Sequence, residues 1–262
     1  MADRTEFEAI ARASIAATMS FDPAKTGQVA MVPEGFKVND LEEFQISPNR
    51  RRANEAFVDI GSLAEYVNTF AETGTMISAN YAGATIGVIV DGHTPDGPGH
   101  REHKAAFTAQ QHDKLRAWLA ICRKPMSQVE FGLFLEDRAV DVVSPEPASV
   151  MEMVMTFDAT KKVTFKSAQR LHDGQRQFQY VEQNEVKGGV TLPDHFTILS
   201  PVYRGMEPQR VKFMVRYRIE DGALRFTVEM HDRDTVLRDA FQRCVDGLRL
   251  GLKEQRPIYV IG

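Results

Sequence analysis

Imidazole and carboxylate groups, which suit metal or acid–base chemistry, gather in the stretch "VIVDGHTPDGPGHREHKAAF" at residues 88–107. Strand geometry would place Asp91 and His93 on one face, and His103 on a returning strand could join them. Two imidazoles and one carboxylate suit Zn²⁺ or a facial-triad Fe²⁺. The alternative is a surface hairpin whose histidines cap strand ends or hydrogen-bond to the backbone.

Known catalytic motifs give this site no support. Its spacing matches no metalloenzyme motif, and the sequence contains no GxSxG, Walker A, HExxH, GxGxxG or paired CxxC motif. Cys122 and Cys244 form no disulfide framework, which fits a reducing cytosol. We therefore favour a non-enzymatic protein with no catalytic residue and no cofactor. A metal-dependent hydrolase or nuclease that uses Asp91, His93 and His103 is the alternative.

A second set of candidate residues lies in a hairpin at residues 210–231. Apolar residues alternate on both sides of "DG" at 221–222, a pair typical of a type I′ turn. The resulting register pairs six apolar residues: Ile219 with Leu224, Tyr217 with Phe226, and Val215 with Val228. A slip of one residue would break every pair, so the sequence specifies this register well.

The other face of this hairpin carries the cations Lys212, Arg216, Arg218 and Arg225, and the register sets Arg218 opposite Arg225. Like charges so placed are destabilising unless an anion relieves them. The face is either solvated, with Glu220 and Glu229 screening it, or in contact with acids of another element or subunit, or bound to phosphate or nucleic acid. No aromatic residue alternates with the arginines, which disfavours the stacking of single-stranded bases.

The chain ends in an apolar segment, "PIYVIG". Pro257 stops the preceding helix, so the segment is predicted to be extended. Ile258 and Val260 then point to one face and Tyr259 and Ile261 to the other, which suits a strand covered on both faces. We expect these four residues to dock on a sheet edge, of their own subunit or of a neighbour, and to make oligomer contacts.

The elements around these residues predict an α+β fold. Ser-x-x-Glu capping boxes start helices at 62, 127 and 149, and an N-terminal helix places Phe7, Ile10, Ala11 and Ile15 on one stripe. Strands are predicted at 84–91, 102–109, 162–171, 176–185, 195–203, 210–220 and 223–231, with a helix around Trp118 and a last one at 234–253. The N-terminal half is helix-rich with a β-hairpin. The C-terminal half has mainly antiparallel strands, closed by a helix and a short terminal strand. We expect one composite domain over 1–262, with a division near 145–160 as the alternative.

Charge and hydropathy limit the cellular location and the classes of partner that we expect. The net charge of −4 gives no global basic field for nucleic acid or an anionic membrane. The longest apolar run, at 84–90, is too short to cross a bilayer, and the N-terminus lacks the apolar region of a signal peptide. We therefore expect a cytoplasmic protein without a membrane partner.

Four segments carry a family resemblance: "VPEGFKVNDLEEF" at 32–44, "KPMSQVEFGLFLED" at 124–137, "TKKVTFKSAQRL" at 160–171 and "FMVRYRIEDGALRFTVEM" at 213–230. In these the chain resembles the YfdQ-like family (DUF2303), phage and prophage proteins of unknown function. The resemblance implies a phage-derived cytoplasmic protein, and its recurrent polar positions fall on Asp91, His93 and Glu102–His103. We expect a self-assembling homo-oligomer acting during phage infection or host takeover. A nucleic-acid-binding replication or recombination accessory is an alternative that the pattern does not favour.

Overall fold

The computed structural model describes residues 6–10, 46–47, 50–156, 158–170, 176–187, 193–220 and 223–262. The chain separates into two compact units, Met1–Arg51 and Arg52–Gly262. In the first unit residues 6–10 are helical, and Phe7 and Ile10 are exposed. Ala11 and Ile15, the rest of the predicted stripe, lie outside the described residues. The second unit carries all the candidate sites.

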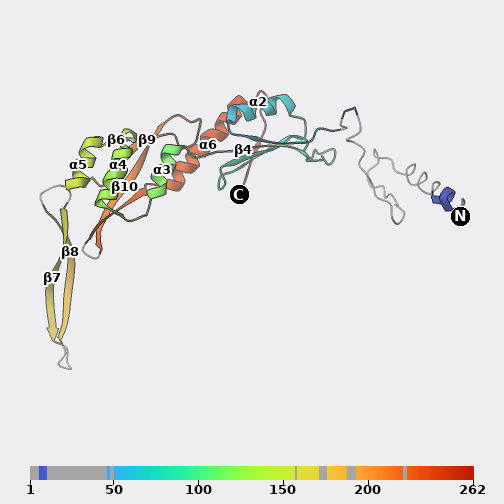
Figure 1. Cartoon of the computed structure of the whole chain (residues 1–262). Coiled ribbons are helices and arrows are strands. Elements are labelled where there is room, and N and C mark those ends of the chain that lie inside the picture. The colour runs from blue at the N-terminus through green and yellow to red at the C-terminus, as the bar shows by residue number, and fades with distance from the viewer. Residues whose placement is uncertain are drawn as a thin grey trace. The chain divides into compact units, whose positions relative to one another are not determined.

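The first sheet of the second unit has the strand order β1-β4-β3-β2-β12. Figure 1 labels its second strand, β4. Its strands are β1 (Ala53–Phe57), β2 (Met76–Asn80), β3 (Thr85–Ile89), β4 (His103–Thr108) and β12 (Ile258–Ile261). The central pairs are antiparallel, whereas β1 pairs with β4 and β12 pairs with β2 in parallel. The predicted strands at 84–91 and 102–109 are confirmed as β3 and β4, and β1 and β2 were not predicted.

Two amphipathic helices pack beside this sheet, α2 (Ile60–Phe70) and α6 (Arg233–Gly251). They approach so closely that a Cβ at Gly251 would lie 2.8 Å from the Cβ of Ala64, which explains the glycine. The capping box predicted at Ser62 is wrong, because Asp59 caps α2 and its carboxylate accepts the Ser62 N–H at 2.7 Å. An aspartate is an equally good N-cap, so the helix starts one turn earlier.

The second sheet has the order β5-β11-β10-β9-β6. Its strands are β5 (Met126–Ser127), β6 (Val142–Ser144), β9 (His195–Ser200), β10 (Gln209–Glu220) and β11 (Ala223–Met230). The β10–β11 register confirms all three predicted apolar pairs. The DG turn itself lies outside the described residues. The strands predicted at 195–203, 210–220 and 223–231 are confirmed, and the short edge strands β5 and β6 were not predicted.

Three helices cover one face of the second sheet: α3 (Asp113–Ile121), α4 (Gln128–Asp137) and, against α4, α5 (Pro147–Thr156). Trp118 of α3 is fully buried and its ring lies 5.0 Å from Phe196 and 5.5 Å from Phe213. The Trp118 Nε1–H donates to the buried Asp141 carboxylate at 3.2 Å, and Lys114 pairs with the same carboxylate. This polar contact is internally satisfied, so it costs the core little.

Of the two remaining capping boxes, one is confirmed and one is wrong. The capping box at Ser127 is confirmed, because Ser127 Oγ accepts the Glu130 N–H and the Glu130 carboxylate accepts the Ser127 N–H. The box at Ser149 is wrong, since α5 already begins at Pro147, a residue preorganised for a first helical turn. The strands predicted at 162–171 and 176–185 are confirmed as β7 (Asp158–Arg170) and β8 (Arg176–Lys187), and they pair antiparallel.

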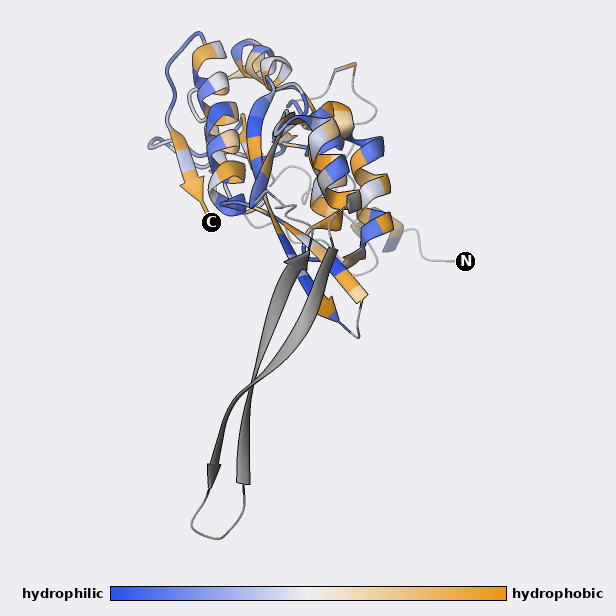
Figure 2. Cartoon of the chain, turned by 90° about the vertical axis from the view of Figure 1, so that its left-hand side faces the viewer, coloured by the Kyte–Doolittle hydropathy of each residue, from blue (hydrophilic) through white to orange (hydrophobic). Residues whose placement is uncertain are grey.

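The protein is therefore an α+β protein, as predicted. The buried apolar residues of both sheets and their helices form one hydrophobic cluster. Helix surfaces mix apolar and polar residues, in keeping with one buried and one exposed side (Figure 2). Within the described ranges, no helix is both long and apolar enough to cross a membrane.

Candidate functional site

The Asp91 carboxylate binds the backbone at the start of β4. Its Oδ1 accepts the N–H of His103 and its Oδ2 the N–H of Glu102, both at 3.0 Å. Partial burial raises the pKa of this carboxyl, but the backbone hydrogen bonds, together with the nearby His103, outweigh burial and hold the pKa below its usual value. Both oxygens thus have backbone partners, and Asp91 fixes the point where the loop joins β4.

His93 also serves the loop between β3 and β4. This loop is folded tightly on its own backbone, because a Cβ at Gly99 would lie 2.1 Å from the Gly92 carbonyl oxygen. The Nδ1 atom of His93 accepts the Gly99 N–H at 3.0 Å. A hydrogen bond from histidine to the backbone is what we expect if this loop belongs to a surface hairpin and not to a metal site.

His103 is a core residue, 3% exposed. Its Nε2 lies 2.6 Å from the Tyr66 hydroxyl, and the Tyr66 and Phe70 rings lie 5.7 and 5.6 Å from its own. Burial, and then the charge of Glu55, raises the pKa of Tyr66, so its hydroxyl keeps its proton near neutral pH. His103 thereby joins the aromatic contact between α2 and β4.

These three residues therefore do not form a common ligand set. The structure brings Asp91 to the backbone of His103, but the His103 imidazole enters the core and His93 bonds within the loop. In the parts of the chain that the structure describes, no group of three or more His, Cys, Asp and Glu side chains could hold a metal ion. Metal binding at Asp91, His93 and His103 stays a hypothesis without a supporting ligand geometry.

The predicted cations of the second hairpin do share one surface. We call this surface the basic face, and it consists of Arg210, Lys212, Arg216 and Arg218 of β10 and Arg225 of β11. Arg218 lies directly opposite Arg225, as the register predicts. The sequence prediction missed Arg210, although its even position on β10 places it on the same side as Lys212, Arg216 and Arg218.

Acidic partners satisfy only part of the basic face. Arg218 Nε pairs with Glu220 at 3.0 Å, as expected if the face is solvated and screened by its own acids. Glu229 instead binds Arg123, at 2.9 and 2.5 Å, and this hydrogen bond is the main cause of its lowered pKa. Among the described residues, the side chains of the other four cations make no hydrogen bond or ion pair. Weaker attraction remains, because Arg216 contributes to the lowered pKa of Glu229 and Arg225 to that of Glu130.

The terminal segment forms a strand, as predicted, and docks within its own subunit. β12 pairs in parallel with β2, setting Ile258 beside Ile77 and Ile261 beside Asn80. It is the last strand of the sheet, and Figure 2 shows its apolar colouring beside the C-terminal label. Ile258 packs against the core, but Tyr259, Val260 and Ile261 are 52%, 71% and 50% exposed. The described part of the chain therefore does not cover both faces of this strand.

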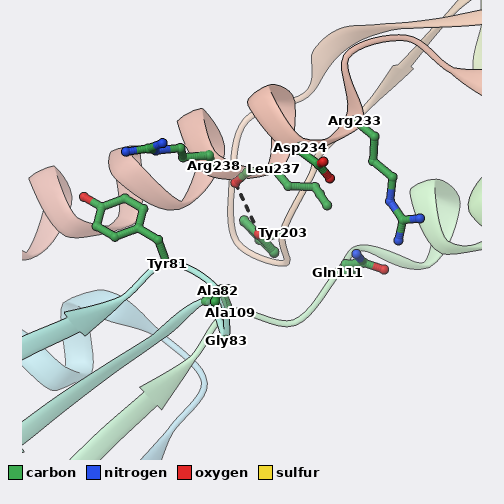
Figure 3. Close-up of a pocket in the computed structure, with 11 residues that line it drawn as sticks. Tyr81, Ala82, Gly83, Ala109, Gln111, Tyr203, Arg233, Asp234, Leu237 and Arg238 are labelled. Carbon is green, nitrogen blue, oxygen red and sulfur yellow. Dashed lines mark hydrogen bonds between the residues drawn. The ribbon is translucent and has the colours of Figure 1, made fainter. Parts of the chain in front are cut away.

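The structure also contains a pocket that sequence reasoning missed. It has a volume of about 610 Å³ and lies between the β2–β3 turn, the segment after β4, Tyr203 and the first half of α6. Figure 3 shows Arg233 pointing toward Gln111 and Arg238 toward Tyr81, with Asp234 and Leu237 between them. No sequence signal could have found it, because segments from residues 81 to 238 contribute its wall.

The polar groups of this pocket suit binding better than catalysis. The Tyr81 hydroxyl donates to Gln242, and the Tyr203 hydroxyl donates to the Leu237 carbonyl oxygen at 3.3 Å. Burial raises the pKa of Tyr203, and the Arg238 guanidinium lies 5.7 Å from the Tyr81 ring centre. Neither hydroxyl is therefore placed next to a base that would activate it.

The two cysteine thiols are also poor nucleophiles. Burial is the largest influence on both and raises the pKa of Cys122 and of Cys244. Both are free, and the thiolate is the reactive form. Neither thiol is activated.

A comparison with known families finds one match over nearly the whole chain. The family described as "Uncharacterized conserved protein (DUF2303)" matches residues 3–260. No curated protein matches the chain, and no solved structure matches it.

Proposed function

We propose that this chain, which belongs to the DUF2303 family, is a non-enzymatic protein that assembles with a second copy of itself through β12. The observation that carries the proposal is the state of this edge. Among the described residues β12 pairs on one side only and so ends its sheet with an open edge, where Tyr259, Val260 and Ile261 are at least half exposed. Unprotected apolar edges are templates for strand pairing, and proteins normally blunt them with charge or cover them.

The opposite edge of the same sheet is blunted. β1 carries Glu55, and Arg52 just before it pairs with Glu102 at 3.0 Å. By contrast β12, with the sequence IYVI, contains no charge and no proline. Two β12 strands that pair antiparallel about a two-fold axis would form a closed dimer and would not propagate into a filament.

The size of this edge sets the expected strength of the dimer. Covering the exposed parts of three apolar side chains contributes roughly 2–4 kcal/mol, to which strand hydrogen bonds add. A stable interface buries about 800 Å² per partner, more than one four-residue strand supplies by itself. We therefore expect a weak equilibrium between monomer and dimer, with a dissociation constant above the micromolar range.

The setting of this assembly rests on the family resemblance. The four segments that resemble phage and prophage proteins support a phage-encoded protein in the bacterial cytoplasm. Assembly would then serve infection or host takeover. Metal-dependent hydrolysis has no ligand set in the described residues to support it.

Sedimentation velocity over a range of protein concentrations tests the proposal. Val260→Glu places a charge on the open edge, and Val140→Glu is the matched control, because Val140 is 85% exposed on a different element. The wild type and Val140→Glu should shift from monomer to dimer, and Val260→Glu should stay monomeric. A wild type that is monomeric throughout, or a Val260→Glu variant that still dimerises, contradicts the proposal.

Point substitution is a sharper test than removal of residues 257–262. β12 covers the edge of β2, so its deletion would open a new edge at Ile77 and Ala79, both buried. Deletion would therefore mix a loss of assembly with a loss of folding. Val260→Glu leaves the pairing with β2 in place.

A further inference from the structure

We propose that the basic face binds the phosphate backbone of double-stranded nucleic acid. This inference concerns the second sheet and does not depend on assembly through β12 in the first. It rests on the placement of five cations on one sheet surface, of which four make no side-chain hydrogen bond or ion pair within the described chain.

The electrostatics of the face call for an anion. Arg218 and Arg225 are direct cross-strand neighbours, an arrangement that is unfavourable by itself. Glu229 is held chiefly by Arg123 and adds only a weaker attraction to Arg216. The whole chain has a net charge of −4, so this cluster runs against the overall balance. A local concentration of positive charge attracts polyanions even on a protein that is acidic overall.

The geometry of the face suits a backbone with regularly spaced charges. Residues two apart on a strand lie about 6.6–6.8 Å apart on the same side. Arg210 and Lys212 form one such pair, Arg216 and Arg218 another, and Arg225 lies beside Arg218 on the next strand. Arg210, Arg216 and Arg218 are exposed, so their guanidinium groups can reach a ligand lying across the sheet. Guanidinium groups bind phosphate oxygens in a two-pronged geometry.

The residues between the cations favour a duplex over a single strand. The other outward positions of β10 and β11 include Met214, Thr227 and Glu229, and none of them is Phe, Tyr or Trp. Binding of a single strand draws on stacking of its bases on aromatic rings. In a duplex the bases are already stacked on one another, and phosphates are denser along the axis. Phosphate contacts alone would give binding without sequence preference.

Fluorescence anisotropy with an end-labelled DNA duplex tests this inference over a series of salt concentrations. Each phosphate contact contributes about −0.9 to the slope of log K against log salt, so four contacts predict a slope of about −3.6. The double variant Arg216→Gln/Arg225→Gln should reduce the slope to about −1.8 and weaken binding at low salt. Arg249→Gln is the control, because Arg249 lies on α6 and pairs with Asp246.

Further arms separate this inference from the alternatives. The labelled single strand should bind more weakly than the duplex, and Val260→Glu should bind the duplex like the wild-type monomer. Three results would overturn the inference: no duplex binding at low salt, an unchanged slope in the double variant, or tighter binding of the single strand. A double variant that changes the sedimentation of the protein but not DNA binding would assign the face to a protein partner and also overturn it. Circular dichroism of each variant confirms that it is folded.

Discussion

The histidine-rich loop and the basic face look equally promising in the sequence and behave oppositely in the structure. In the loop, Asp91, His93 and His103 each bond to the chain itself. On the basic face, four of five cations make no side-chain hydrogen bond or ion pair within the described chain. Polar groups that satisfy one another stabilise the fold, whereas clustered cations that face solvent without an ion pair stay available to an anionic ligand. Clustered chemical groups are therefore informative only once their partners are known.

The largest effect that would sharpen this comparison is expected at Asp91. Asp91→Ala removes the acceptor of two backbone N–H groups and should lower the free energy of unfolding by about 2–4 kcal/mol. Asp96→Ala, an exposed carboxylate of the same loop, is the control and should leave stability unchanged. Urea denaturation measures both variants. A stable Asp91→Ala protein would return the loop to the list of functional candidates.

A second, smaller loss is expected in the aromatic contact around His103. Tyr66→Phe keeps the ring but leaves the buried His103 Nε2 without its hydroxyl partner, at a cost of about 1–3 kcal/mol. Tyr259→Phe, on the open edge, removes an exposed hydroxyl and should change stability little. The midpoint of thermal unfolding compares the two variants. Equal midpoints would mean that the hydroxyl does not hold His103.

The structural role of Asp91 also predicts a dependence of stability on pH. Its carboxyl has a lower pKa in the folded protein than in the unfolded chain, so the folded state favours its ionised form. Its contribution is therefore present above the unfolded pKa of about 3.9 and is lost as pH falls through the lower folded value. Urea denaturation at neutral pH and below about pH 4 measures this loss. Asp91→Asn should lack this part of the acid-induced loss, and an identical pH profile would contradict the assignment.

The smallest expected effect has the opposite sign and lies on the basic face. Arg225→Gln removes the repulsion with Arg218 and should raise the free energy of unfolding by about 0.2–1 kcal/mol. Arg249→Gln, which breaks an exposed ion pair, should not stabilise the protein. If Arg225→Gln gains stability but loses duplex binding, Arg225 serves ligand binding at the expense of stability. A loss of stability would make the face structural, like the loop.

Local sequence was sufficient for elements whose specification is local. Alternating apolar residues and the DG pair predicted the full β10–β11 register, including the opposed Arg218 and Arg225, because a one-residue slip reverses every side chain. Ser127 and Glu130 predicted the start of α4 for the same kind of reason. The capping boxes at Ser62 and Ser149 failed because the residues just before them, Asp59 and Pro147, also start helices well.

The sequence by itself thus determined the α+β class, the strands and helices with strong periodicity, the cation pattern of the second hairpin and the extended terminal segment. Only the tertiary structure decided that β12 joins β2 in parallel, that the His103 imidazole enters the core, and that distant segments enclose the pocket beside α6. The physical reason is the range of the interactions. Periodicity and capping act over a few residues, whereas parallel pairing and burial depend on segments nearly 200 residues apart, such as Ile77 and Ile258.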